Sequence, residues 1–146
     1  MVNLGLSKLK IFNLPIFTRN YRLMKLLGNV LWIVFGGLLI AIEYFIASLI
    51  LMITIIGIPF GIQTLKLAEL ALWPFGKNIE NHETSSGLYT FMNLIWILIG
   101  GVWISLSHII IGILLGITIV GIPFAVQHFK LASLALTPFG KTIIKD

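Results

Sequence analysis

The chain has 146 residues, of which 58% are hydrophobic and 10% are charged, and its mean hydropathy is +1.06. Soluble domains usually carry about a quarter charged residues, so this composition excludes a water-soluble globular protein and indicates a multi-pass membrane protein. The formal net charge is +5, and cysteine is absent, which excludes disulfides, thiolate metal sites and cysteine nucleophiles.

Residues 1–27 form a basic arm that contains no acidic residue. Half of the ten basic residues of the chain lie in it: Lys8, Lys10, Arg19, Arg22 and Lys25. The positive-inside rule predicts that this arm, and with it the N-terminus, is cytoplasmic. Aromatic residues among the basic ones could suggest a nucleic-acid surface, but an arm at the lipid interface explains both residue types, so we expect no nucleic-acid partner. The apolar segment that follows is too long for a signal peptide, and we expect it to be retained.

Most of the remaining sequence is an internal duplication. Residues 29–79 recur at 93–143 with a shift of 64 positions and no gap, and about half of the aligned residues are identical. We therefore divide the chain into a first membrane repeat (28–77), a polar connector (78–91) and a second membrane repeat (92–144). The repeated landmarks are Asn29/Asn93, Trp32/Trp96, Gly36-Gly37/Gly100-Gly101, Ile53–Phe60/Ile117–Phe124 and Pro74–Lys77/Pro138–Lys141.

Each repeat begins with a long apolar run. The runs Asn29–Thr54 and Asn93–Thr118 predict helices of about 26 residues, or about 39 Å, which are long enough to cross a bilayer even when tilted. Strands are the rival interpretation of such isoleucine-rich runs, but an open sheet cannot satisfy its edges in lipid and there are too few strands for a barrel. The predicted fold is therefore an all-α integral membrane protein built from a tandem duplication.

A Gly-Ile-Pro segment divides each repeat, at Gly57 and Pro59 in the first copy and at Gly121 and Pro123 in the second. Proline lacks an amide donor and disfavours helical geometry in the residue before it, while glycine tolerates a turn. This pattern predicts a helix break, with the proline in the first turn of a second, shorter helix. The second helix ends at the Pro-Phe-Gly segment.

The second helix of each repeat carries a polar stripe, with Gln63 and Lys66 in the first copy and Gln127 and Lys130 in the second. It either lies amphipathically in the interface or re-enters the membrane with its stripe turned toward protein or water. Recrossing gives two parallel hairpins, whereas lying flat gives inverted repeats. The distribution of basic residues slightly favours inverted repeats, because the side of the membrane that holds the connector would then carry fewer lysines than the side that holds the two ends of the chain. Lysines at the same step in both copies favour parallel hairpins, because both copies would then see the same membrane face. We therefore predict parallel hairpins.

Two ionisable residues fall in the middle of the long apolar helices. Glu43 lies in the first, and His108 lies at nearly the equivalent place in the second. An ionised carboxylate in lipid costs at least a few kcal/mol unless it is paired or hydrated. One hypothesis is that Glu43 and His108 face one another or share a wet cavity on an ion or proton path. The alternative is that the apolar stretch bends and brings Glu43 to the headgroups.

Other features give weaker indications. Gly112 and Gly116 form a small-residue pattern that suits internal helix packing or a homo-oligomer seam. His82 with Glu80 and Glu83 in the connector is better explained as a solvated loop than as a metal site. The sequence has no nucleophile with a base, no phosphate loop and no zinc signature, so we expect no enzyme, no catalytic residues, no metal and no cofactor.

The repeated motifs N-x-x-W-x-x-x-G-G, I-T-I-x-G-I-P-F and Q-x-x-K-L-A-x-L-A-L-x-P-F-G-K resemble those of the YccF family of bacterial inner-membrane proteins. The resemblance covers both repeats. It implies two copies of an inner membrane component domain and several spans in the bacterial plasma membrane. It supplies no activity and no binding residues.

These features suggest two functions of different classes. The broken helices, the polar stripes and the midplane pair of Glu43 and His108 are what a small channel or transport component needs, and four short helices would have to form a homo-oligomer to enclose a pathway. The alternative is a non-conducting partner or assembly subunit that packs against another membrane protein through its small-residue faces.

Overall fold

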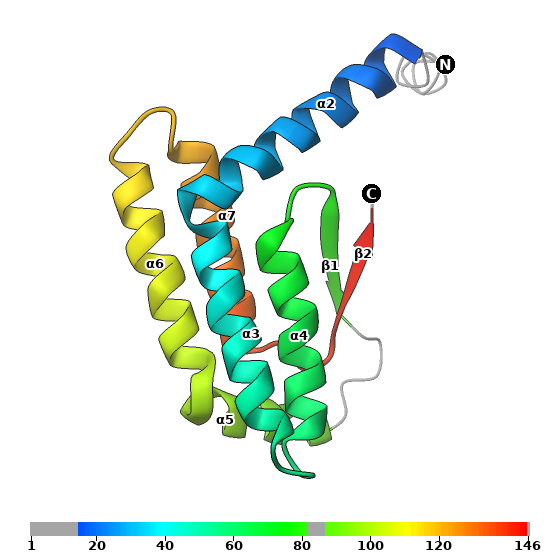
Figure 1. The fold of residues 1–146 in the computed structure, drawn as a ribbon, viewed down its shortest axis with the longest axis vertical. Coiled ribbons are helices and arrows are strands. Elements are labelled where there is room, and N and C mark those ends of the chain that lie inside the picture. Colours follow the sequence, from blue (N-terminus) through cyan, green and yellow to red (C-terminus); the bar gives the residue numbers. More distant parts are fainter. Residues whose placement is uncertain (1–14, 82–86, 146) are drawn as a thin grey trace, which may run out of the picture.

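The computed structural model describes residues 15–81 and 87–145 of the chain (Figure 1). The first part of the basic arm, with Lys8 and Lys10, lies outside the described residues. The same holds for His82 and Glu83 of the connector.

Both repeats contain the same elements in the same order. The first has α2 (Pro15–Trp32), the π-helical segment η1 (Ile33–Gly37), α3 (Leu38–Met52), α4 (Ile58–Leu72) and β1 (Lys77–Asn81). The second has α5 (Gly87–Trp96), the π-helical segment η2 (Ile97–Gly101), α6 (Val102–Gly116), α7 (Ile122–Leu136) and β2 (Lys141–Lys145). This confirms a mostly helical, duplicated fold with a helix break at each Gly-Ile-Pro. The two strands and the two π-helical segments were not predicted.

The long helix of the first repeat is bent rather than straight. Gly36 has a φ of 111°, in the left-handed region that favours glycine, and Phe35 before it also leaves helical geometry. As a result α2 leaves the bundle at a steep angle to α3 (Figure 1). Gly100, the counterpart of Gly36, keeps helical geometry, so the left-handed residue belongs to the first repeat alone, although α5 also lies across the end of the bundle at an angle to α6 (Figure 1).

Two helices, Thr18–Met52 and Gly87–Gly116, are long and apolar enough to cross a membrane by length and composition. Their outward faces carry large apolar side chains that are exposed. On α3 these are Leu38, Leu39, Ile42, Phe45, Ile46, Leu49 and Ile50, and on α6 they are Val102, Trp103, Leu106, Ile109, Ile110, Ile113 and Leu114. Such a surface suits contact with acyl chains.

The two repeats are inverted relative to one another. The turn between α3 and α4 lies at the lower end of the bundle, and the turn between α6 and α7 lies at the upper end (Figure 1). β1 and β2 pair antiparallel, with Lys77 opposite Lys145 and Asn81 opposite Lys141. The favoured prediction of parallel hairpins is therefore wrong.

An approximate two-fold axis relates the repeats and can be located from residues 64 positions apart. Ile79 pairs directly with its own counterpart Ile143 at the centre of the sheet. On the opposite side of the bundle, Glu43 accepts a hydrogen bond from its own counterpart Ser107. The axis passes through both pairs, across the bundle. It brings Lys66 and Lys130 to the same lateral side, so identical lysines do not require a common membrane face.

The repeated Asn and Trp residues hold the end of each hairpin closed. The Asn29 side chain accepts a hydrogen bond from the Phe75 amide and donates one to the Phe75 carbonyl, both at 2.9 Å. Trp32 Nε1 donates to the Ala71 carbonyl at 2.6 Å, near the C-terminal end of α4. The second repeat makes the same contacts through Asn93 and Trp96. The Asn and Trp residues thus satisfy backbone groups that α4 and α7 leave open at their ends.

Replacing Asn29 by alanine is expected to lower the free energy of unfolding by roughly 2 to 4 kcal/mol, because both backbone groups of Phe75 then lose their partner. Thermal unfolding of the detergent-purified protein measures the effect. Asn20→Ala on the exposed part of the same helix is the matched control and should change stability little. Equal loss in both variants would contradict the assigned role of Asn29.

Candidate functional site

We call the polar face the lateral surface built by α4, α7 and the two strands. Its exposed or half-buried polar residues include Gln63, Lys66, Glu69, Lys77, Glu80, Lys130, Ser133, Lys141, Thr142 and Lys145. A cavity of about 360 Å³ lies on this face between α4 and the sheet, and a smaller one of about 140 Å³ lies between α7 and the sheet. Residues from both repeats line each cavity.

The polar face is positive, since it carries five lysines and two glutamates, Glu69 and Glu80. Lys77 Nζ lies 2.8 Å from Glu69 Oε1. This ion pair compensates the charge of Lys77. Lys141 is hydrogen-bonded to the Asn81 side chain, which leaves its charge uncompensated. The face as a whole therefore attracts anions.

The four residues of the predicted stripe differ in their surroundings, although Gln63 lines the same cavity as Lys66. Lys66 and Lys130 are exposed on the polar face. Gln63 Nε2 instead donates to the Pro138 carbonyl at 2.8 Å and so ties α4 to the other repeat. Gln127 lines a separate cavity of about 340 Å³ beside the Pro74 segment.

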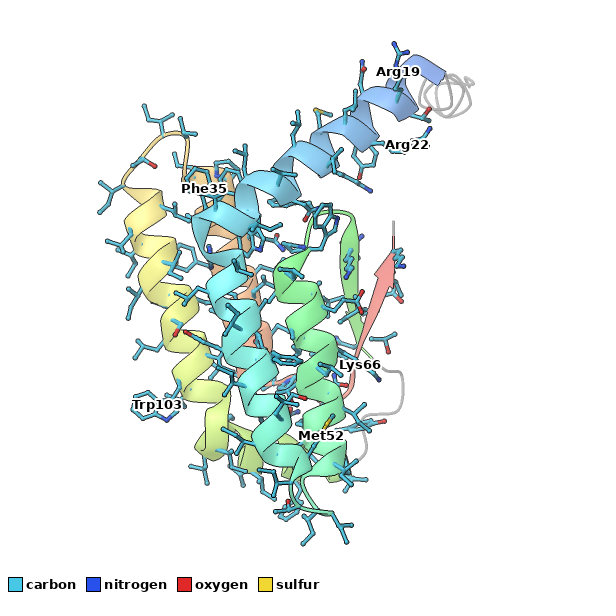
Figure 2. All side chains as sticks on the ribbon, in the orientation of Figure 1. Arg19, Arg22, Phe35, Met52, Lys66 and Trp103 are labelled. Carbon is cyan, nitrogen blue, oxygen red and sulfur yellow. The ribbon has the colours of Figure 1, made fainter. Side chains whose placement is uncertain are left out.

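The molecule has two lateral sides of opposite character. Figure 2 shows Trp103 pointing away from the bundle on the α6 side, whereas Lys66 lies on the side that carries β1 and β2. Within the described residues the sheet has only two strands, so each strand has one edge without a strand partner. Backbone groups at such an edge need water or protein as a partner and are not tolerated against lipid.

The predicted pair of Glu43 and His108 is not formed. Glu43 lies where α3 meets α6 and accepts a hydrogen bond from Ser107 at 3.1 Å. His108 is fully buried on the other side of α6, and its Nδ1 lies 3.0 Å from Nδ1 of His128 on α7. Ser107 and His108 are neighbours in α6, but Ser107 contacts Glu43 on α3 whereas His108 contacts His128 on α7. Glu43 is half-buried between the helices.

The two histidines form a buried pair with one defined proton arrangement when both are neutral. His128 Nε2 lies 3.1 Å from the Phe35 carbonyl, which can only accept, so Nε2 carries the hydrogen. His128 Nδ1 then accepts from His108 Nδ1–H. This leaves His108 Nε2 as an acceptor without a hydrogen-bond partner among the described residues. The pair connects the second repeat to the kink of the first.

His128 was missed from the sequence, although a signal for it exists. His108 and His128 are each ten residues from Thr118, so a hairpin that turns at Thr118 places them opposite one another. The first repeat has Tyr44 and Thr64 at these two positions, which makes the histidine pair specific to the second repeat. Across residues 15–81 and 87–145, no three His, Asp or Glu side chains gather in a way that could hold a metal ion.

Comparisons with known proteins agree with this duplicated architecture. The family model of the inner membrane component domain, YccF, matches residues 27–77 and again residues 91–141. The chain is 29% identical over 131 residues to the inner membrane protein YccF of Escherichia coli (strain K12), covering 83% of this chain and 88% of that protein. The YccF protein of Shigella flexneri gives the same values. No solved structure matches the chain. With two matches that together span more than half of its length, this chain is a membrane protein that belongs to the YccF family.

Proposed function

We propose that copies of this protein assemble with their polar faces together and enclose a water-filled route for small anions across the inner membrane. The observation that carries the proposal is the position of the polar face. Lysines and open strand edges lie along the same length of the molecule as α3, whose own outward surface is apolar.

The depth of the sheet supports this assembly. β1 and β2 run alongside the hairpin of α3 and α4 (Figure 1). A chain whose α3 crosses the bilayer therefore carries its sheet at bilayer depth. Charged side chains and strand edges at that depth are tolerated only where they meet protein or water. Another copy of the chain supplies both, because it brings an identical polar face and leaves water between the two.

The charge of the face supports anions as the solute. Rings of lysine or arginine select anions in pores, and this face carries five lysines against two glutamates. A single protomer offers only an open face. The route is complete only in a closed symmetric assembly, so a dimer or a small ring is required.

Flux measurements in liposomes test the proposal. Purified protein should release trapped chloride or nitrate faster than empty liposomes do, with little passage of potassium. Lys66→Gln should lower anion flux several-fold, because it removes a charge from the route. Arg19→Gln removes the same charge from α2, outside the polar face, and should leave the flux unchanged. An oligomer that conducts nothing would contradict the proposal. A non-conducting protein that always purifies with one other membrane protein would favour an assembly subunit.

Labelling of single cysteines adds an independent test, because the chain has no native cysteine. Thr142→Cys on the sheet should react with a membrane-impermeant maleimide in intact membranes. Ile110→Cys on the outward side of α6 should not react, because lipid covers it. An unreactive Thr142→Cys would show that no water reaches the polar face.

A further inference from the structure

A second basic cavity lies near the base of α2, away from the α3 and α6 faces. Its volume is about 580 Å³, and it is bounded by α2, the C-terminal end of α4 and the end of β2. Four basic side chains line it: Arg22, Lys25, Lys77 and Lys145. Glu69, which also lines it, is hydrogen-bonded to Lys77. The cavity therefore keeps a net positive charge after this ion pair is counted.

The rest of the cavity wall is apolar and aromatic. It is formed by Leu26, Leu72, Trp73 and Phe75. Leu26, Leu72 and Trp73 are each more than a third exposed, so this wall is open to a ligand. The apolar surface continues along α2 through Leu23 and Leu27, which are about half exposed. A basic cavity that opens onto an apolar strip suits an amphiphile with an anionic head.

The position of the cavity fits the membrane interface. Figure 2 shows Arg19 and Arg22 on the part of α2 that leaves the bundle. Lys25 Nζ lies 4.1 Å from the centre of the Tyr21 ring, a cation–π contact typical of residues at headgroup level. Basic pockets between helices at this level bind the headgroups of anionic lipids.

The second repeat has no equivalent cavity chemistry, although its backbone is related by the two-fold axis. Tyr89 stands where the first repeat has Lys25, and Thr137 stands where it has Trp73. Asn81 occupies the strand position equivalent to that of Lys145. The fold alone therefore does not impose four basic residues around an aromatic wall. They are a property of the first repeat.

We propose that this cavity binds the phosphate group of an anionic phospholipid, with the acyl chains lying along the apolar strip of α2. Arg22 and Lys25 contact the phosphate from α2, and Lys145 contacts it from β2. Trp73 packs against the glycerol and the first methylenes. The site does not depend on conduction, because it lies within one protomer and its α2 residues, Arg22 and Lys25, are outside the polar face, although it shares Lys77 and Lys145 with that face.

The test uses the full-length protein in an uncharged detergent. It is titrated with short-chain phosphatidylglycerol, short-chain phosphatidylcholine and inorganic phosphate, and binding is followed by native mass spectrometry. A Trp103→Phe background makes Trp73 the most exposed tryptophan, so quenching by brominated phosphatidylglycerol reports on the cavity itself. We expect phosphatidylglycerol to bind about tenfold more tightly than either phosphatidylcholine or inorganic phosphate.

Matched variants separate the cavity from general surface charge. Arg22→Gln combined with Lys25→Gln should weaken phosphatidylglycerol binding roughly 30-fold, and Arg22→Gln alone roughly fivefold. Arg19→Gln combined with Lys66→Gln removes the same charge outside the cavity and should change binding less than about twofold. Equal loss in the two double variants would overturn the proposal, as would equal affinity for the two lipids. Inorganic phosphate that binds as tightly as phosphatidylglycerol would overturn the lipid as the source of the phosphate.

Discussion

Replacing Gly57 by valine is expected to destabilise the protein by more than about 3 kcal/mol and to prevent it from accumulating in the membrane. A Cβ atom at this position would lie 1.9 Å from the Leu51 carbonyl oxygen, which is backbone and cannot move aside. The Gly57 amide also donates to Thr54 Oγ1 at 3.0 Å, so the tight turn cannot open without losing that bond. The midpoint of thermal unfolding and the membrane yield measure the effect.

The chain offers a repeat of this experiment and a control. Gly121→Val should be as damaging, because its Cβ would lie 2.1 Å from the Leu115 carbonyl oxygen. Gly87→Val should cost little, since no atom of the described residues lies within 4 Å of a Cβ at that position. If Gly57→Val and Gly87→Val had the same unfolding midpoint, the close approach at the Gly-Ile-Pro turn would not limit stability.

Trp32→Ala should lower the free energy of unfolding by about 4 to 6 kcal/mol. The loss combines the cavity left by a fully buried aromatic side chain with the loss of the donor to the Ala71 carbonyl. Trp32 also packs on the His128 ring at 4.2 Å between centroids, so the change reaches the second repeat. Chemical or thermal unfolding in detergent measures the loss.

Two further substitutions divide this effect into its parts. Trp32→Phe keeps most of the ring and removes the donor, so we expect a loss of about 1 to 3 kcal/mol. Trp103→Ala is the matched control, because Trp103 is 69% exposed on the outward side of α6 and makes no comparable buried contact. A Trp103→Ala variant as unstable as Trp32→Ala would contradict the assigned role of the buried indole.

Local features of the fold could be predicted because they depend on neighbouring residues. Proline cannot continue a helix, and glycine allows the approach to Leu51, so the breaks at Gly57 and Gly121 follow from the sequence alone. The duplication is likewise visible without a structure. The kink at Gly36 could not be predicted, because its counterpart Gly100 remains helical with the same residue type.

The inverted arrangement depends on contacts between distant residues, which local sequence patterns do not predict. β1 is short and mostly polar, so it looks like part of a loop, and its partner β2 lies 64 residues further along. Lys66 and Lys130 occupy equivalent positions in the two repeats. Both parallel and inverted repeats are compatible with this, because the two-fold axis of the inverted fold also places both lysines on one lateral side. Local patterns therefore could not decide between parallel and inverted repeats.

At the candidate site, the sequence predicted which polar residues are exposed better than it predicted which residues contact one another. Lys66 and Lys130 are exposed on a common face, as a stripe requires. Glu43 contacts Ser107 instead of His108, because the two-fold axis brings equivalent positions together at the contact between α3 and α6. Which face of α6 meets which face of α3 is a tertiary property, and a difference of one residue in register changes the partner.

Cross-linking between strands tests the inverted repeats most directly. Glu80 lies opposite Thr142 in the antiparallel register, whereas a parallel arrangement would put Glu80 opposite its counterpart Ile144. Directly opposed residues are close enough for a disulfide, and the cysteine-free chain provides a clean background. Mild oxidation of membranes should cross-link the Glu80→Cys/Thr142→Cys pair rapidly and the Glu80→Cys/Ile144→Cys pair poorly. The reverse order of cross-linking would contradict the inverted fold, and with it the shared polar face.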